Sequence, residues 1–375
     1  MKVVTVVGAR PQFVKAATVS RAFAALGRSV QEVIVHTGQH FDANMSEVFF
    51  TEMQIPRPQY QLELGGLGHG AMTGRMLESI EGILKDERPD WVLVYGDTNS
   101  TMAGALAAVK LSMPVAHVEA GLRSFNRAMP EEINRVVADH VSTLLFAPTD
   151  VAVRNLANEG IEGGKVVRSG DVMFDAALHY SRMAPGDTLG RFGLQPKGYF
   201  LATIHRQENV DSPERLATIV QALVQCSSEM PVLLPIHPRT RKALEARGLL
   251  DPVGANRLKL VDPVGYLDMV QLERNARLVL TDSGGVQKEA YFFGVPCVTT
   301  REEPEWVELV ECGANRLAPP GSVDSVLGAV RAALGTQASF GAGLYGEGRS
   351  ADAIARSPAA ASTSRFARPS RKPFN

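Results

Sequence analysis

The sequence is poor in the features that mark secreted, membrane-spanning and nucleic-acid-binding proteins. It has three cysteines, Cys226, Cys297 and Cys312, which are too few and too scattered for a disulfide framework or a zinc cluster. No apolar run reaches the roughly 18 residues that a membrane-spanning helix needs. The formal charge is -1 with both signs mixed along the chain, so no broad field would attract nucleic acid or an anionic membrane. We therefore expect a cytoplasmic protein that binds neither.

At 375 residues, 45% of them apolar and 21% charged, the chain is long enough for two domains that each bury a core. Short apolar runs bounded by turn residues alternate with helical periodicity. This pattern is typical of a buried parallel β-sheet covered by helices. The runs predicted as strands are residues 3–7, 32–37, 91–95, 115–118, 143–146, 199–204, 232–234, 258–261, 278–281 and 297–299.

Changes in composition predict the domain boundaries. A first domain covers residues 1–182, a linker rich in structure-breaking residues covers 183–198, and a second domain covers 199–346. The tail, 347–375, is rich in Ser, Ala, Arg and Pro without apolar periodicity, so we expect it to be disordered. The predicted fold class is α/β, with two Rossmann-like doubly wound domains whose strand C-termini face a cleft.

Two cations follow the first predicted strand. Arg10 lies in the turn GARP, and Lys15 lies one helical turn further on. Cations near a helix N-terminus can hold phosphate or a leaving diphosphate. Alternatively, Lys15 is a solvated lysine and Arg10 pairs with a nearby carboxylate. The turn is not a Walker loop, because the GK[ST] ending is absent.

Three carboxylates follow later strands of the same half. Asp97 is either an active-site group or the cap of the next helix. Glu119 ends an apolar strand, where an unpaired charge is costly, so we expect it to be paired or protonated. Glu131 follows Pro130 in a first helical turn and is either an active-site group or a partner of the helix dipole. Parallel strands end at one edge of a sheet, so the three carboxylates are predicted to converge there.

Two histidines follow strands of the second half. His205 precedes Arg206 at a strand end, where a basic pair facing a cleft commonly meets an anion. His237 repeats the pattern one strand later. It is either a ligand contact or a packed, hydrogen-bonded histidine.

The run TDSGGVQKEA carries the strongest pattern. Ser283, Gly284 and Gly285 open a helix directly after a strand, so backbone N–H groups and a hydroxyl can face a diphosphate. Glu289 lies one turn into that helix and is placed to accept hydrogen bonds from ribose. The alternative is an ordinary strand-to-helix turn.

Six motifs together resemble a known family. The non-hydrolysing UDP-N-acetylglucosamine 2-epimerases have, in this order, the runs GARP (8–11), TGQH (37–40), GDT (96–98), HVEAGLR (117–123), PEEINR (130–135) and TDSGG (281–285). The resemblance implies the glycosyltransferase-B fold, a UDP-sugar substrate and a homodimer. It also implies that no metal or other cofactor is needed.

The reaction that the resemblance implies interconverts UDP-N-acetylglucosamine and UDP-N-acetylmannosamine for surface polysaccharides. UDP is eliminated to give 2-acetamidoglucal and is then added back. Catalytic roles carried over from the family fall on Asp97, Glu119, Glu131 and His205. Substrate-binding roles fall on Arg10, Lys15, His237, Ser283, Gly284, Gly285, Glu289 and Arg301.

The chain departs from the family pattern at three places. Trp306 stands where the common members carry an arginine shortly after the SGG helix, although Arg301 is nearby. Asp42 stands where an activator-binding glutamine occurs in some bacterial members. Family members end in a helix that returns to the first domain, whereas the pattern here fades after Gly348.

Other functions stay open at this stage. The runs GQHFDANM (38–45), HRQEN (205–209), PVGYL (263–267) and EWVE (305–308) resemble the branch that acts on UDP-2,3-diacetamido-2,3-dideoxyglucuronate in O-antigen synthesis. A retaining glycosyltransferase of the same fold would need an acceptor pocket instead of carboxylates facing C2. A UDP-sugar sensor would bind without turnover.

Overall fold

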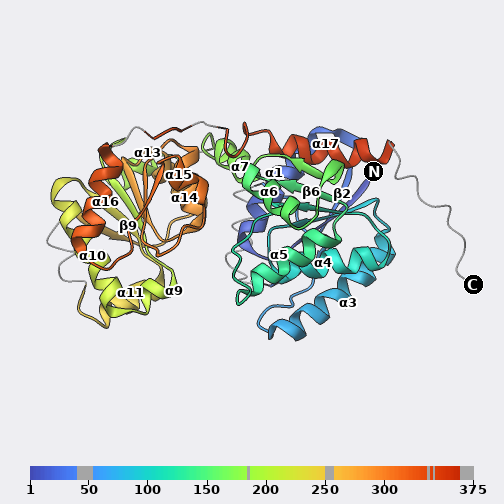
Figure 1. The fold of residues 1–375 in the computed structure, drawn as a ribbon, viewed down its shortest axis with the longest axis horizontal. Helices are drawn as coiled ribbons and strands as arrows, with labels where there is room; N and C mark the ends of the chain where they lie inside the picture. The colour runs from blue at the N-terminus through green and yellow to red at the C-terminus, as the bar shows by residue number, and fades with distance from the viewer. Residues whose placement is uncertain (40–53, 184–185, 250–256, 336–337, 341–342, 364–375) are drawn as a thin grey trace, which may run out of the picture. The chain divides into compact units, whose positions relative to one another are not determined.

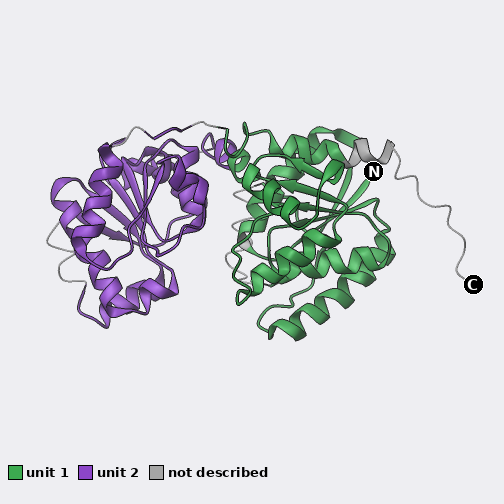
Figure 2. Cartoon of the chain, in the orientation of Figure 1, with its two compact units in different colours: residues 1–176, 343–375 green, residues 177–342 purple. Residues whose placement is uncertain are grey.

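The computed structural model describes residues 1–39, 54–183, 186–249, 257–335, 338–340 and 343–363. The chain forms two compact units (Figures 1 and 2). Unit 1 comprises Met1–Ala176 with Gly343–Asn375, and unit 2 comprises Ala177–Ala342. Each unit contains one parallel β-sheet, which confirms the predicted α/β fold with two doubly wound domains.

The sheet of unit 1 has seven strands in the order β3-β2-β1-β4-β5-β6-β7, and all its pairings are parallel. Its inner strands are buried on both faces, which explains their continuous apolar sequences. The strands are β1 (Lys2–Val7), β2 (Gln31–His36), β3 (Tyr60–Gln61), β4 (Trp91–Tyr95), β5 (Val115–Val118), β6 (Leu144–Ala147) and β7 (Val166–Arg168).

Helices of unit 1 cover this sheet and bury apolar side chains against it. The helix α3, for example, packs Met76, Ile80 and Leu84 into the core that β1 and β4 share. The helical segments are α1 (Arg10–Ala25), η1 (Gly27–Ser29), α3 (His69–Glu87), α4 (Asn99–Lys110), α5 (Pro130–Val141), α6 (Asp150–Asn158), η2 (Gly163–Lys165), α7 (Val172–Tyr180), which runs into unit 2, and α17 (Ser350–Thr363).

The sheet of unit 2 has six parallel strands in the order β10-β9-β8-β11-β12-β13. They are β8 (Phe200–Thr203), β9 (Val232–Pro235), β10 (Leu258–Val261), β11 (Leu278–Thr281), β12 (Cys297–Thr299) and β13 (Asn315–Leu317). The helices are α8 (Thr188–Arg191), α9 (Gln207–Val210), α10 (Pro213–Glu229), α11 (Pro238–Glu245), α13 (Tyr266–Asn275), α14 (Gly284–Phe292), α15 (Val307–Glu311) and α16 (Val323–Gly335).

All ten predicted strands are present, with ends that differ by a residue or two. Three short strands, β3, β7 and β13, were not predicted. They lie at sheet edges and are only partly buried, so their sequences lack the continuous apolar run that reveals a central strand.

The structure differs from the predicted linker at residues 183–198. Its described part belongs to unit 2, where Asp187 caps α8 by accepting the N–H of Gly190 at 2.8 Å. Leu194 is buried in the core beside Tyr199. The structure-breaking residues of this segment form a helix cap and a turn and not a linker. The boundary between the two units lies inside α7.

The predicted disordered tail also differs from the structure. Residues 350–363 form α17, which packs against α1 in unit 1 (Figure 1). Ala351, Ile354 and Ala355 are buried, and the carboxylate of Asp175 accepts the N–H of Ala351 at 2.9 Å. Alanine-rich helices have weak apolar periodicity, so composition alone did not reveal this one. The returning family helix is therefore present. Residues 364–375 lie outside the described part.

Candidate active site

The GARP turn is held by Gln12, a residue that the sequence analysis did not single out. Gln12 is 2% exposed. Its Oε1 accepts the N–H groups of Gly8 and Ala9 at 2.7 and 3.0 Å, and its Nε2 donates to the carbonyl of Tyr95 at 2.6 Å. The turns after β1 and β4 are thereby joined. A Cβ on Gly8 would lie 2.1 Å from Ser100 Oγ, so only glycine fits there.

Lys15 and Glu119 form an ion pair inside unit 1. Lys15 projects from the first turns of α1, and Glu119 follows β5. The two side chains are each 10% exposed, so Lys15 is not the solvated lysine that was the alternative. A Cβ on Gly96 would lie 3.3 Å from Glu119 Oε2 and 3.4 Å from Lys15 Nζ. The ion pair therefore lies directly against the turn that precedes Asp97.

Glu119 also has an uncommon backbone conformation. Its φ is 71°, in the left-handed region that costs free energy for a residue with a side chain. The N–H groups of Glu119 and Ala120 both donate to the carbonyl of Phe146, at 3.1 and 3.0 Å. Such strain persists where the surrounding structure enforces it, which is common at functional sites.

Asp97 is not a helix cap. Thr98 caps α4 instead, with its side chain accepting the N–H of Thr101. The carboxylate of Asp97 pairs with Arg135 of α5, and its carbonyl accepts from Asn134 Nδ2 at 2.9 Å. The helix that carries Glu131 thus supplies both residues that fix Asp97.

Glu131 and Glu132 have different surroundings in the first turn of α5. Glu131 is exposed. It lies on the helix face of Asn134 and Arg135, three and four residues further on. Glu132 is 2% exposed and accepts the N–H groups of Ser124 and Phe125 at 2.9 and 3.0 Å. Burial opposes ionisation of Glu132, but the hydrogen bonds from Ser124 and Arg135 hold its pKa below the ordinary value.

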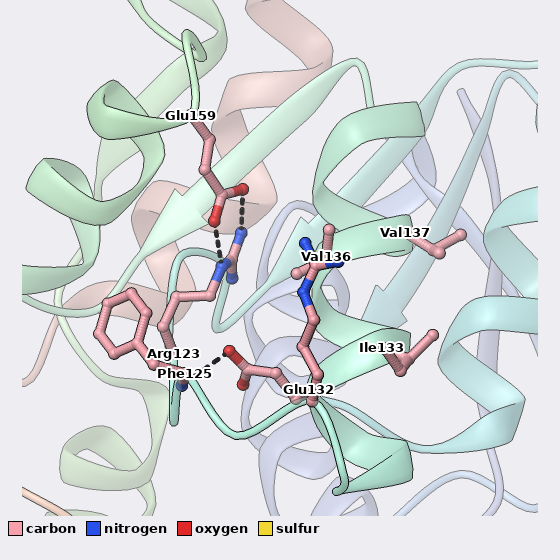
Figure 3. Close-up of a pocket in the computed structure, with 8 residues that line it drawn as sticks. Arg123, Phe125, Glu132, Ile133, Val136, Val137 and Glu159 are labelled. Carbon is pink, nitrogen blue, oxygen red and sulfur yellow. Dashed lines mark hydrogen bonds and ion pairs between the residues drawn. The ribbon is translucent and has the colours of Figure 1, made fainter.

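A pocket lies between the loop after Glu119 and α5 (Figure 3). Its carboxylates are already engaged: Glu159 accepts from Arg123 Nε and Nη2 at 2.7 and 2.8 Å, and Glu132 holds the loop backbone. These bonds fix the loop that joins Glu119 to Glu131. The pocket is lined by Arg123, Phe125, Arg127, Glu132, Ile133, Val136, Val137 and Glu159.

In unit 2, His205 has a buried carboxylate partner that the sequence analysis did not assign. Asp282 is 0% exposed, and its Oδ1 lies 3.0 Å from His205 Nδ1. Burial alone would raise the pKa of Asp282, but the hydrogen bond and charge of His205, with Asn209 and the Arg206 N–H, hold it below the ordinary value. The His205 side chain is 45% exposed, so its ring is held by Asp282 on one side and is accessible to solvent on the other. The sequence contained a signal for this partner, because Asp282 is the aspartate of the TDSGG motif.

The Ser283-Gly284-Gly285 turn opens α14, as predicted, with Ser283 at the N-cap and no side-chain capping bond. A carboxylate of this chain lies against it. A Cβ on Gly284 would meet Glu305 Oε1 at 2.1 Å. Glu305 Oε2 also accepts from Arg206 at 2.9 Å and from Arg301 at 2.5 Å. The turn and two arginines thus already surround one negative group.

Trp306, where the family resemblance led us to expect an arginine, supports the same turn. Its indole N–H donates to the carbonyl of Gly284 at 2.9 Å, and Lys288 Nζ lies 4.3 Å from the centre of its ring. Trp306 therefore supplies a buried contact to the backbone of this turn.

Glu289 is 7% exposed and accepts a hydrogen bond from Tyr266 OH at 3.0 Å. Glu273 lies behind it, fully buried. Burial, together with the charge of Glu289, raises the pKa of Glu273 well above its ordinary value.

His237 is an exposed N-cap and not a packed residue. Its Nδ1 accepts the N–H of Arg239 at 3.2 Å at the start of α11. Two predictions concern parts of the chain that the structure does not describe: Asp42 lies outside the described residues, as does the Arg10 side chain.

Among the described residues, no group of three or more His, Cys, Asp and Glu side chains is arranged to hold a metal ion. Within the same part of the chain, no helix is long and apolar enough to cross a membrane.

Comparison with known proteins gives concordant results. A sequence profile of the family described as UDP-N-acetylglucosamine 2-epimerase matches residues 24–357. The UDP-2,3-diacetamido-2,3-dideoxy-D-glucuronate 2-epimerase of Pseudomonas aeruginosa is 54% identical over 359 residues, which cover 95% of this chain and 98% of that protein. The UDP-N-acetylglucosamine 2-epimerase of Methanocaldococcus jannaschii is 43% identical over 363 residues, covering 95% and 98%.

Solved structures agree. The crystal structure of the Methanocaldococcus jannaschii enzyme in complex with UDP-GlcNAc and UDP has a TM-score of 0.82, over 95% of this chain and 99% of that chain. The Neisseria meningitidis enzyme bound to UDP-GlcNAc has a TM-score of 0.82 at 28% identity, over 94% and 98%. The chain belongs to the UDP-N-acetylglucosamine 2-epimerase family, whose members are carbohydrate epimerases.

Proposed function

We propose that this enzyme interconverts UDP-N-acetylglucosamine and UDP-N-acetylmannosamine without net hydrolysis. One observation in unit 1 carries the assignment of the catalytic centre. The Lys15–Glu119 ion pair lies against Gly96, directly before Asp97, at the ends of the adjacent parallel strands β4 and β5. Family membership supplies the reaction, and this arrangement supplies carboxylates that can carry it.

The chemistry needs two proton-transfer groups because inversion at C2 exchanges one proton for another on the opposite face of the sugar. One carboxylate takes the proton from C2 while the C1–O bond breaks, and UDP leaves with the bonding electrons. A second group then delivers a proton to the other face, and UDP adds back to C1. We assign these steps to Asp97, Glu119 and Glu131, with His205 as a further acid–base group.

The leaving diphosphate needs positive partners as its charge develops. We assign Arg10, Lys15 and Arg301 to that charge, and the Ser283 hydroxyl with the N–H groups of Gly284 and Gly285 at the start of α14 to the diphosphate of bound UDP. Glu289 would accept from ribose hydroxyls, and His237 would contact the substrate from the start of α11.

A second substrate is favoured by a specific observation. The relative from Pseudomonas aeruginosa, which is named for UDP-2,3-diacetamido-2,3-dideoxy-D-glucuronate, is 54% identical to this chain. The relative from Methanocaldococcus jannaschii, which is named for UDP-N-acetylglucosamine, is 43% identical. The same elimination and re-addition would serve both sugars, since C2 carries an acetamido group in each.

Incubation of the purified enzyme with each sugar in D₂O tests the proposal. We expect deuterium at C2 of both epimers, measured by NMR and mass spectrometry, with slow release of UDP and 2-acetamidoglucal or its uronate counterpart. The Glu119→Gln variant should lose exchange by about 10³-fold, as expected for a proton-transfer group. The exposed control Glu81→Gln on α3 should match wild type. No deuterium in either sugar would refute the assignment.

The family resemblance also leads us to propose a homodimer in the cytosol. Light scattering coupled to size-exclusion chromatography would give twice the 40.4 kDa mass of the chain for a dimer. A mass equal to one chain at micromolar concentration would refute the dimer.

A further inference from the structure

A fully buried pair, His117 and Asp139, lies behind the carboxylate turns of unit 1. Both side chains are 0% exposed. His117 is on β5, two residues before Glu119, and Asp139 is on α5. His117 Nδ1 lies 2.7 Å from Asp139 Oδ1, and His117 Nε2 lies 2.8 Å from the carbonyl oxygen of Gly96. Neither residue has a role in the proposed chemistry.

The hydrogen-bond partners of His117 fix the orientation of its ring. A carbonyl oxygen can only accept, so His117 Nε2 must donate to Gly96. Asp139 also acts as an acceptor, because its Oδ2 takes the N–H of Gly121 at 3.0 Å and an N–H of Arg123 at 2.7 Å. Burial opposes its ionisation, but His117 and Arg123 keep the pKa of Asp139 below the ordinary value. Both ring nitrogens of His117 therefore face acceptor oxygens.

Arg123 is the cation that faces Asp139. It pairs with Asp139 at 2.7 Å and with Glu159 at 2.7 Å. The side chains of Arg123 and Asp139 are 1% and 0% exposed, whereas that of Glu159 is 26% exposed, so the two fully buried charges balance each other. Buried charges are tolerated when they are paired in this way.

His117 acts on the two turns that carry Asp97 and Glu119, directly through Nε2 and through Asp139 at Nδ1. Gly96 has a φ of 62°, and its N–H donates to the carbonyl of Val118 at 3.0 Å. Its own carbonyl is held by His117. Glycine has wide conformational freedom, so without that bond the peptide between Gly96 and Asp97 can rotate. On the other side, Asp139 fixes the N–H of Gly121, two residues after Glu119.

We propose that His117 is a buried positioning residue that holds the Asp97 and Glu119 turns in the mutual geometry that proton transfer at C2 requires. It touches neither substrate nor reacting atoms. This role rests on the proposed function of Asp97 and Glu119.

Two substitutions separate the two hydrogen bonds. The amide nitrogen of Asn in His117→Asn occupies roughly the position of Nδ1, which keeps the bond to Asp139 and loses the bond to Gly96. The longer Gln in His117→Gln places its nitrogen near Nε2 and keeps the bond to Gly96. A displacement of about 1 Å in a catalytic group costs on the order of 100-fold in rate.

We expect His117→Asn to lower kcat about 100-fold with KM for the UDP-sugar within about threefold. His117→Gln should recover at least about tenfold of that loss, because the Gly96 carbonyl is held again. His140→Asn is the matched control, since His140 is an exposed histidine of the same helix that carries Asp139. All variants are compared at equal folded fraction, determined by circular dichroism and thermal melting.

Three results would overturn the proposal: a His117→Asn kcat within threefold of wild type, no recovery in His117→Gln, or a loss that the folded fraction accounts for completely. Nitrogen NMR of the labelled protein tests the hydrogen bond to Gly96 independently of activity. We expect Nε2 of His117 to carry a proton because it donates to the Gly96 carbonyl, and an unprotonated Nε2 would refute that hydrogen bond. If the wild-type enzyme exchanges no C2 proton, the proposed function is wrong. The NMR measurement still tests His117 separately, because it does not depend on activity.

Discussion

The carboxylate of Asp282 is a heavily hydrogen-bonded buried charge of unit 2. It accepts from the N–H groups of His205 and Arg206, each at 3.1 Å, and from Asn209 Nδ2 at 3.0 Å, and it pairs with the His205 ring. The substitution Asp282→Asn keeps the shape but turns one oxygen into an NH₂ group that faces these donors. We expect both lower stability and a misdirected His205.

The magnitude follows from the bonds that are lost. Hydrogen bonds to a charged group contribute about 1.5–3 kcal/mol each, and breaking a buried pair costs about 3–5 kcal/mol. One amide oxygen still accepts in the variant, so we expect a loss of about 3 kcal/mol from the free energy of unfolding of unit 2. With a urea m-value of about 2 kcal/mol/M, the unfolding midpoint moves down by about 1.5 M.

The two tryptophans allow unit 2 to be followed alone. Trp91 lies in unit 1 and Trp306 in unit 2, so a Trp91→Phe background leaves fluorescence from unit 2 only. Urea unfolding in that background with and without Asp282→Asn gives the difference. The control is Asp262→Asn, whose side chain is 91% exposed and whose ion pair should contribute no more than about 0.5 kcal/mol.

The pH dependence has a definite sign. The folded pKa of Asp282 is lower than its unfolded value, so its stabilisation is fully present above about pH 4 and is lost as the pH falls through the folded pKa. The difference between wild type and Asp282→Asn should therefore shrink in acid. A midpoint shift below about 0.3 M at pH 7, or a difference that grows in acid, would refute the reasoning.

Three further substitutions test other parts of the site. Glu305→Gln should tighten UDP binding by about three- to tenfold, measured by calorimetry, because a competing anion leaves the α14 turn, and weaker binding would contradict the proposed diphosphate site. Gly8→Ala should destabilise unit 1 by about 2 kcal/mol, followed by Trp91 fluorescence, since its Cβ would lie 2.1 and 2.2 Å from two buried hydroxyl oxygens; an unchanged midpoint would contradict this close packing. Glu132→Gln should cost about 2 kcal/mol at neutral pH because its NH₂ group would face one of the two loop N–H donors, and an equal cost at pH 3 would contradict that cause.

Sequence patterns were reliable where a residue's surroundings follow from its position along the chain. Central strands such as β1 and β4 are buried on both faces, so each has a continuous apolar run. The turn before α14 needs two glycines after a strand, a local requirement that is visible in the letters. Motif order identified the family, and the family comparison confirmed it.

Sequence patterns failed where the local signal is weak and the structure depends on contacts with residues far away in the chain. Nothing in the tail predicts that Ile354 is buried, because α17 acquires its apolar partner only by packing on α1. Asp97 is of a residue type that commonly caps helices, but Thr98 forms the cap of α4, and Arg135 pairs with the carboxylate of Asp97.

The sequence alone determined the two parallel sheets, the order of the motifs and the family of this enzyme, because apolar periodicity and turn chemistry are local properties. Only the tertiary structure decided which partner each polar group has: Lys15 for Glu119, Asp282 for His205, and Asp139 for His117. These pairs join residues between 22 and 104 positions apart. Their free energy comes from burial and hydrogen-bond geometry, which exist only after the chain has folded.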